Sequence, residues 1–231
     1  KVISILSLSL IVSFTLMSGN VFAYKESDLK QLRYTGECSS CDLSDANLWN
    51  MNLSKSNLSG ANLSGANLTN ANLSGSNLTG AYLYKANLTG TNLTGANLSG
   101  VDLSNRDIHD ADLSCCDLSN ANLSHTILFY VKLRGSDLRH INLSNAKLWD
   151  AELYGAMLQD ADLQSSDLFY SDLRNTDLSN ANLGGVNLRH ANFDGALLDS
   201  VNFQGANYDS QTFETVSKKY QSLLEQQGNL W

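Results

Sequence analysis

Four cysteines and four histidines are the side chains in this 231-residue sequence that could support metal or redox chemistry. Cys38 and Cys41 are separated by two residues, a spacing found in zinc sites, in redox-active thiol pairs and in disulfides. A zinc site would need two further ligands. The other pair, Cys115 and Cys116, lies far along the chain. Which chemistry is open to these residues therefore depends on the elements that position them.

A five-residue repeat runs through most of the sequence. It extends from residue 41 to residue 208 without an insertion or deletion, which makes 34 pentapeptides. The central residue is Leu in 30 of them, and the exceptions are Ile108, Phe193, Phe203 and Tyr208. Two positions earlier, all but three of the pentapeptides have Ala, Ser, Thr, Val or Cys, and one position earlier all but seven have Asn or Asp.

This period fits neither a flat strand nor an α-helix, because side chains return to the same face after about 2 and about 3.6 residues in those elements. A chain that turns a corner every five residues accommodates it. The large central residue and the small residue two positions earlier would then point inward and fill a narrow interior without voids. Asn and Asp suit the bends, since their side chains hydrogen-bond to neighbouring backbone groups.

Residues 61–65, Ala-Asn-Leu-Ser-Gly, and residues 66–70, Ala-Asn-Leu-Thr-Asn, resemble the repeats of pentapeptide-repeat proteins. The resemblance covers about three quarters of the chain. It implies an all-β fold, a right-handed quadrilateral parallel β-helix with four pentapeptides per coil, and hence 8.5 coils over residues 41–208. With coils about 4.8 Å apart, the rod would be about 40 Å long.

The two ends of such a rod are sheet edges that must be covered. We expect residues 24–40 to form an N-terminal cap, with a short helical turn from Asp28 to Arg33. We expect residues 209–231 to form a C-terminal capping helix, because apolar residues recur there at helical spacing. These residues are Phe213, Val216, Tyr220, Leu223 and Leu224. An end cap is also where two copies could pair as a homodimer.

On this rod the histidines cannot form one metal site, because they fall on three different sides. They are His109, His125, His140 and His190. No Gly-rich phosphate loop, paired-carboxylate motif or nucleophile–histidine pair stands out in the sequence. We therefore expect no metal, no cofactor and no catalytic residues, and a protein that is not an enzyme.

The two cysteine pairs would lie about four coils apart, too far to share a metal ion. Cys116 falls on an inward small-residue position, where it would serve as filler. For Cys38 and Cys41 we predict a disulfide in the N-terminal cap, with free thiols as the alternative.

Arg106 is the one charged residue at an inward small-residue position. Burying an unpaired guanidinium would cost on the order of several kcal/mol. The wall must therefore bulge to release it, or a carboxylate and backbone carbonyls must satisfy it. We predict a local distortion of this coil, which would be either a tolerated defect or a functional site.

The outward surface divides the rod into two halves. Up to Gly100 it is mostly Ser, Thr, Asn and Gly, whereas beyond Val101 the rod carries 15 acidic and 7 basic residues together with clustered aromatic residues. Residues 20 apart should stack on consecutive coils, which predicts a candidate partner-binding strip. Its members are His109, Phe129, Tyr130, Trp149, Phe169, Tyr170 and Arg189. The alternative is that the stacked rings only reinforce the wall.

Three classes of function fit this surface. The first is an exported scaffold that binds a protein or a glycan through the decorated half. The second is a DNA-mimicking topoisomerase inhibitor, an activity that the family resemblance implies for some members. Export and interspersed basic residues such as Arg134 and Arg139 argue against it. The third is a purely structural rod. The formal net charge of −8 argues against nucleic acid or anionic lipid as a direct partner.

Residues 1–23 have the layout of a secretory signal peptide, with Lys1 before an apolar stretch and small residues at Val21 and Ala23. Since the sequence starts without Met, we expect at least one residue ahead of Lys1. The apolar stretch is short for a bilayer span, so we expect no stable membrane span in the mature form. The predicted location is the periplasm, a lumen or the extracellular space.

Cleavage after Ala23 predicts that the mature protein begins at Tyr24. It would remove one base, Lys1, and no acid, so the formal net charge would change from −8 to −9. Mass spectrometry of the exported protein checks this expectation. An exported chain that retains the apolar segment would contradict it.

Overall fold

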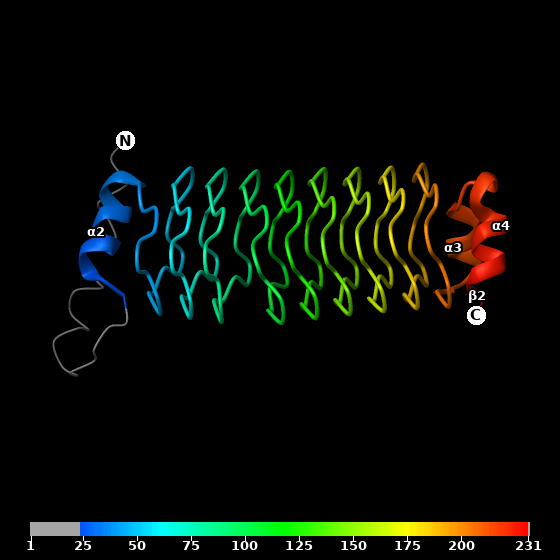
Figure 1. The fold of residues 1–231 in the computed structure, drawn as a ribbon, viewed down its shortest axis with the longest axis horizontal. Helices are drawn as coiled ribbons and strands as arrows, with labels where there is room; N and C mark the ends of the chain where they lie inside the picture. The colour runs from blue at the N-terminus through cyan, green and yellow to red at the C-terminus, as the bar shows by residue number, and fades with distance from the viewer. Residues whose placement is uncertain (1–23, 231) are drawn as a thin grey trace.

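The computed structural model describes residues 24–230, so the expected signal peptide lies outside the described residues. Residues 37–208 wind into a straight stack of coils with helices at both ends (Figure 1). Each coil contains four pentapeptides, as shown by the parallel pairing of most residues before a central Leu with the residue 20 positions later, for example Asn122 with Asn142. Within residues 24–230, no helix is both long enough and apolar enough to cross a membrane.

The coils are built from single bridging residues rather than long strands. Only Asn207–Tyr208 (β1) and Asn229–Leu230 (β2) form two-residue strands within residues 24–230. Every other described face contributes one bridging residue, because a turn follows directly after the central residue. The expected all-β rod is therefore a four-sided ladder of isolated parallel bridges.

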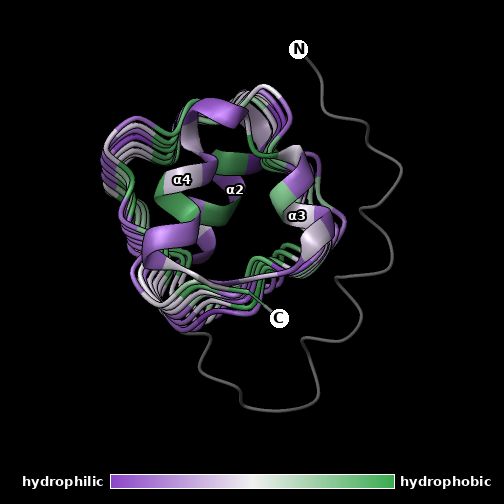
Figure 2. Ribbon diagram, turned by 90° about the vertical axis from the view of Figure 1, so that its right-hand side faces the viewer, coloured by the Kyte–Doolittle hydropathy of each residue, from purple (hydrophilic) through white to green (hydrophobic). Residues whose placement is uncertain are grey.

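The interior of the rod is filled by the two inward positions of each pentapeptide. The central residues from Leu43 to Tyr208 are all buried, and so are most of the small residues two positions earlier. In the view along the rod, the coils superimpose on one another around these residues (Figure 2). Burial of large apolar side chains on every coil gives one continuous core along the whole length.

Each bend is stabilised by a side chain and by the backbone together. The Oδ1 atom of Asn142 accepts a hydrogen bond from the backbone N–H of Ser144 at 3.0 Å, and most Asn and Asp residues at this position do the same. The backbone N–H of Ala146 then donates to the carbonyl of Leu143, also at 3.0 Å, and closes a β-turn. This is the bend-stabilising role expected of Asn and Asp.

The last residue of every pentapeptide adopts a left-handed conformation, which the residue pattern alone did not lead us to predict. Asn145 has φ 58° and Gly155 has φ 67°. A β-turn with positive φ at its third residue favours Gly or Asn there, because Gly has no β-carbon and the short polar side chain of Asn can hydrogen-bond locally in this conformation. This requirement explains why Gly and Asn recur at this position.

The N-terminal cap is a helix, Glu26–Thr35 (α2), which is longer than the expected turn over Asp28 to Arg33. Leu29 and Leu32 are buried in the cap and join the core of the rod. The Asp28 carboxylate accepts a hydrogen bond from the backbone N–H of Asp42 at 2.9 Å, which ties the helix to the first coil.

At the other end, two helices cover the last coil instead of the single helix expected over 209–231. They are Ser210–Thr215 (α3) and Lys218–Gln227 (α4). The chain is extended at Val216, with ψ 126°, and this break lets both Val216 and Leu224 bury themselves against the coil. After α4, β2 pairs in parallel with β1 and continues the ladder by one step.

The left-handed position leads to a stability prediction at Asn145, whose side chain is exposed. Asn145→Gly should change the free energy of unfolding by only a few tenths of a kcal/mol (~0.3), since Gly tolerates this conformation. Asn145→Val should lower it by about 1–2 kcal/mol, because a β-branched residue is strained there. Urea unfolding of both variants checks this, and equal stability of the two would contradict it.

Candidate partner-binding surface

Five aromatic residues lie side by side on consecutive coils of the C-terminal half. We call Phe129, Tyr130, Trp149, Phe169 and Tyr170 the aromatic strip. Phe129, Trp149 and Phe169 are the fourth residues of pentapeptides 20 positions apart, and Tyr130 and Tyr170 directly follow two of them. The 20-residue coil therefore brings together residues that are 41 positions apart in the sequence.

The rings of the aromatic strip contact one another edge to face or at a tilt. The centroid of Trp149 lies 6.0 Å from that of Phe129 and 5.8 Å from that of Phe169. Tyr130 lies 6.5 Å from Trp149, and Phe169 lies 4.7 Å from Tyr170. These separations are within the range of favourable aromatic pairs.

Much of this aromatic surface faces the solvent. Tyr130 is 50% exposed, Trp149 42% and Tyr170 51%. Phe129 and Phe169 are partly buried between their neighbours. The strip is thus a contiguous group of large side chains that the rod itself leaves partly uncovered.

His109, the expected first member of the strip, turns toward a carboxylate instead. Its Nδ1 atom lies 2.7 Å from Oδ1 of Asp107, and no ring contact joins it to Phe129 within the described residues. The carboxylate is two residues away on the same turn, so it is reached more easily than a ring on the next coil. His109 therefore lies in the predicted column without extending the cluster of rings.

The opposite end of the strip includes a residue that was not assigned to it from the sequence, His190. Its ring stacks on Tyr170 with centroids 4.5 Å apart and meets Phe169 at 5.3 Å. The sequence did contain a signal for this contact, because His190 lies 20 residues after Tyr170 and so occupies the equivalent position on the next coil. Arg189, which was expected there, places its Cζ atom 5.8 Å from the centroid of Phe169.

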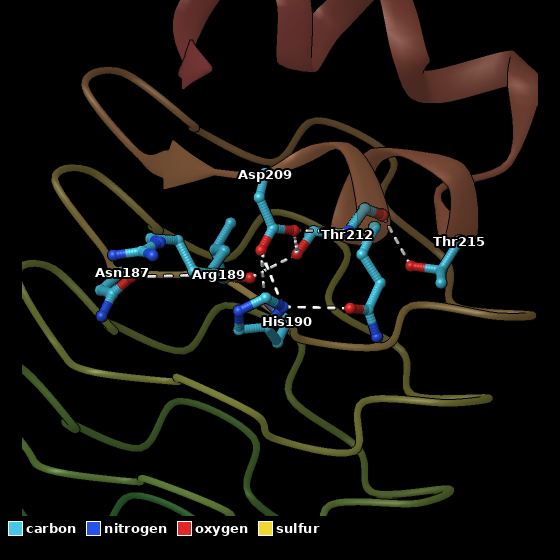
Figure 3. A network of polar contacts seen from close by, with 8 residues as sticks. Asn187, Arg189, His190, Asp209, Thr212 and Thr215 are labelled. Atoms are coloured by element: carbon cyan, nitrogen blue, oxygen red, sulfur yellow. Dashed lines mark hydrogen bonds and ion pairs between the residues drawn. The ribbon is translucent and has the colours of Figure 1, made fainter. Parts of the chain in front are cut away.

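His190 also connects the strip to the C-terminal cap (Figure 3). Its Nδ1 atom lies 2.9 Å from Oδ2 of Asp209 and 3.0 Å from Oε1 of Gln211. Asp209 caps α3, because its Oδ1 atom accepts a hydrogen bond from the backbone N–H of Thr212 at 2.8 Å. The orientation of the last ring is therefore fixed by the helix that closes the rod.

The Asp209 carboxyl is held in its ionised form by these contacts. Burial alone would raise its pKa, but the hydrogen bonds from Thr212 and the nearby His190 outweigh burial. The pKa of Asp209 consequently lies below its usual range.

Arginines on the neighbouring and opposite sides of the decorated half are paired with carboxylates. Arg139 contacts Asp137 at 2.6 Å, and Arg174 contacts Asp172 at 2.7 Å. The hydrogen bonds from these arginines hold the pKa of each aspartate below its ordinary value. Arg134 similarly lies 2.8 Å from Glu152. The decorated half thus presents mixed ion pairs and not a continuous negative stripe.

The cysteines fall into three environments, of which the exposed surface position of Cys115 is one. Cys38 and Cys41 form a disulfide with an S–S distance of 2.07 Å beside α2. Cys116 is buried, and burial raises its pKa to about 12. Over residues 24–230, no group of three or more His, Cys, Asp or Glu side chains is arranged to hold a metal ion.

At Arg106 the ladder between two coils is interrupted. The bridges that the 20-residue period would place between Tyr82 and Asp102 and between Asn87 and Asp107 are absent from the described ladder, whereas those from Asn72 to Asn92 and from Asn77 to Asn97 are present. The coils consequently stay in register on two sides and separate on the other two. The wider spacing is visible at the lower edge of Figure 1, between the blue-green and green coils.

The Arg106 side chain explains this opening. It is too long for the interior position, where the residues one coil before and after are Ala86 and Thr126. It leaves the interior between the coils and places its Cζ atom 5.0 Å from the centroid of Tyr84. Its Nε atom is buried and has no hydrogen-bond partner within the described residues.

The coil of four pentapeptides, its Leu core and its terminal helices define a solenoid repeat protein. The sequence matches the family described as pentapeptide repeats, with 8 copies, over residues 37–75, 66–105, 107–145, 136–175 and 176–207. The chain belongs to the pentapeptide repeat family. Members of this family form right-handed quadrilateral β-helices, and the four-sided coil described above has that architecture.

Among solved structures, the chain is similar to HetL, a pentapeptide repeat protein involved in heterocyst differentiation regulation in Nostoc sp. strain PCC 7120. The two share 30% identity over 74% of this chain and 84% of HetL, with a TM-score of 0.59. A second Nostoc PCC 7120 pentapeptide repeat protein, alr5209, shares 31% identity over 52% of this chain and 84% of its own, with a TM-score of 0.30. A search of the curated proteins found no match.

The link between His190 and the cap leads to a pH prediction for Asp209→Asn. A carboxyl whose pKa is lower in the folded state stabilises the protein above its unfolded pKa of about 3.9, and that stability is lost as the pH falls through the folded pKa. The variant should therefore be less stable than the wild type at pH ~7, with a difference that shrinks below pH ~4.

Thermal unfolding between pH ~7 and pH ~2 measures this difference. Asp194→Asn serves as the control, because Asp194 is an exposed carboxyl on the same part of the rod. If the gap between wild type and Asp209→Asn stayed constant over the whole range, the carboxylate would have no such role.

Proposed function

We propose that this protein is an exported, non-enzymatic scaffold that docks a partner protein on the aromatic strip. The observation that carries the proposal is the contiguous exposure of Tyr130, Trp149 and Tyr170 on one side of the rod. Trp, Tyr and Arg are the side chains that most often dominate protein–protein binding energy. The disulfide between Cys38 and Cys41 agrees with an oxidising compartment and so with export.

The geometry of the rings favours a protein over a glycan. A sugar chain stacks on flat ring faces that are open to it. Here Phe129 and Trp149 meet at an interplanar angle of 89°, and Phe169 and Tyr170 meet at 86°. Trp149 is tilted by 32° to Tyr130 and by 57° to Phe169, so the rings form an irregular surface that apolar side chains of a protein can fill. Arg189 and His190 would form the polar rim at one end.

A purely structural role accounts less well for the two tyrosines. A stacked pair of rings stabilises a wall by about 0.2–1 kcal/mol. Tyr130 and Tyr170, however, occupy the left-handed position, with φ 57° and 59°. That conformation costs a residue with a side chain about 1–2 kcal/mol. Gly or Asn at both positions would stabilise the wall more, because these residues adopt the left-handed conformation at a lower cost in free energy.

The alternative of a DNA-mimicking topoisomerase inhibitor needs a continuous negative surface. The ion pairs of Arg134, Arg139 and Arg174 divide that surface. The remaining expectation, a homodimer formed through an end cap, stays a prediction.

The test replaces Phe129, Trp149 and Phe169 together by Thr, the residue that the same column has at Thr69 and Thr89. Affinity capture from the exported fraction, followed by a direct binding measurement with each captured protein, compares this variant with the wild type. We expect the variant to fold, as judged by circular dichroism and thermal unfolding, and its affinity for the partner to fall by at least about 100-fold.

A matched triple variant controls for the loss of exposed apolar surface elsewhere. It combines Tyr154→Thr, Met157→Asn and Leu197→Asn, which change exposed residues outside the strip to residue types that the repeat already uses. This control should bind as the wild type does. If the folded strip variant bound its partner as the wild type does, the rings would only reinforce the wall. If the variant lost binding to a captured glycan and not to a protein, the proposal of a protein partner would be wrong.

A further inference from the structure

The interrupted ladder at Arg106 opens a cleft in the wall of the rod, well away from the C-terminal end of the aromatic strip. The cleft has a volume of about 320 Å³. It is lined by residues of two successive coils, which are Lys85, Ala86, Asn87, Thr89, Asn105, Arg106 and Asp107. Every position on this wall other than Ala86 is a polar or charged residue.

Two cations converge on this cleft around one aromatic ring. Lys85 places Nζ 5.4 Å from the centroid of Tyr84, and Arg106 places Cζ 5.0 Å from the same centroid. Both charged groups therefore lie beside one ring, although they belong to successive coils. Within residues 24–230, neither of them has an ion pair with a carboxylate.

The one carboxylate of the cleft is engaged elsewhere. Asp107 lies 2.7 Å from Nδ1 of His109. This arrangement differs from Arg134, Arg139 and Arg174, which each contact a carboxylate directly. The cleft is thus a positive site on a protein whose formal net charge is −8.

Backbone donors also remain available on both walls. In the rest of the rod the N–H groups of equivalent residues donate to the facing coil, as Leu103 does to Asn122 at 2.7 Å. The corresponding bonds from Lys85 to Ser104 on the next coil and from Asp107 to Ala86 on the preceding coil do not occur in the described ladder. Unpaired donors and cations that face one space form a surface suited to an anion.

We infer that this cleft binds a small oxyanion ligand, one that carries a phosphate or a carboxylate group. Lys85 and Arg106 supply the charge, and the free backbone N–H groups and the Asn and Thr side chains supply neutral donors. Arg recognises both oxyanions through paired N–H groups, while Lys acts as a point charge. The bound anion would relieve the repulsion between the two cations, which lie beside one ring.

An inserted peptide strand fits the opening less well. The missing bridges lie on two adjacent faces of the coil, and the chain turns a corner between them at Tyr84 and Lys85. A straight strand could pair along one face only. A compact anion can contact both walls from the corner.

Binding is tested with purified protein and two probes, inorganic phosphate and succinate, each compared with sodium chloride at equal ionic strength. Calorimetry and the thermal unfolding midpoint are followed against probe concentration. We expect a saturable response to at least one probe and none to chloride. At a probe concentration of about 100 times the Kd, the folding equilibrium should shift by about 100-fold.

Two variants and one control locate the response. Lys85→Asn should weaken binding at least about tenfold, since a charged hydrogen-bond donor is lost while Asn suits the left-handed backbone there. Arg106→Ala should abolish binding and leave the unfolding midpoint unchanged or raised, because the ladder can close. Lys55→Asn makes the same change at the same pentapeptide position outside the cleft and should bind as the wild type does.

A response to phosphate alone would identify a phosphate ligand, and a response to succinate alone would identify a carboxylate ligand. Absence of a saturable response to both probes in the wild type would overturn the inference. It would also be overturned if Lys85→Asn and Arg106→Ala bound with wild-type affinity. Arg106 would then be a packing defect of the wall and nothing more.

Discussion

The hydrogen-bond ladder between successive coils is the constraint on which the rest of this structure depends. Each coil donates to and accepts from the next through backbone groups about one coil apart in the sequence, as in Leu123 with Asn142 and Asn142 with Ala121. A single inserted residue would break every such pair on its coil and would turn a Leu out of the core. The uninterrupted register over 34 pentapeptides is therefore a requirement of the ladder. The ladder also decides which side chains are neighbours on the surface.

Because the ladder has one fixed period, much of the molecule could be predicted from the sequence. The inward positions follow from the period of five. The four-sided coil follows from the family resemblance, and the stacking of Phe129, Trp149 and Phe169 then follows from four pentapeptides per coil. A period predicts position but not side-chain rotation. His109 consequently lies in the expected column yet turns to Asp107, and His190 joins the rings through contacts that also involve the C-terminal cap.

The ends were harder to predict, since no repeat constrains them. The spacing of apolar residues indicated a helical cap but not the break at Val216 that divides it into α3 and α4. That break depends on the shape of the last coil, and the spacing of apolar residues in the cap gives no information about this shape. The left-handed turn position was missed for a different reason. Residues as diverse as Tyr130, Lys85 and Ser165 occupy it, so the preference for Gly and Asn is only partial.

The 20-residue coil has a consequence for how distances along this molecule can change. Inserting or deleting one whole coil would keep every column in line and would move the aromatic strip relative to α2 by one coil spacing, about 4.8 Å. Any other change in length would break the register. The distance between the disulfide-bonded cap and the strip can therefore change only in steps of one coil spacing. A partner that contacted both the cap and the strip would bind only rods with a particular number of coils between them.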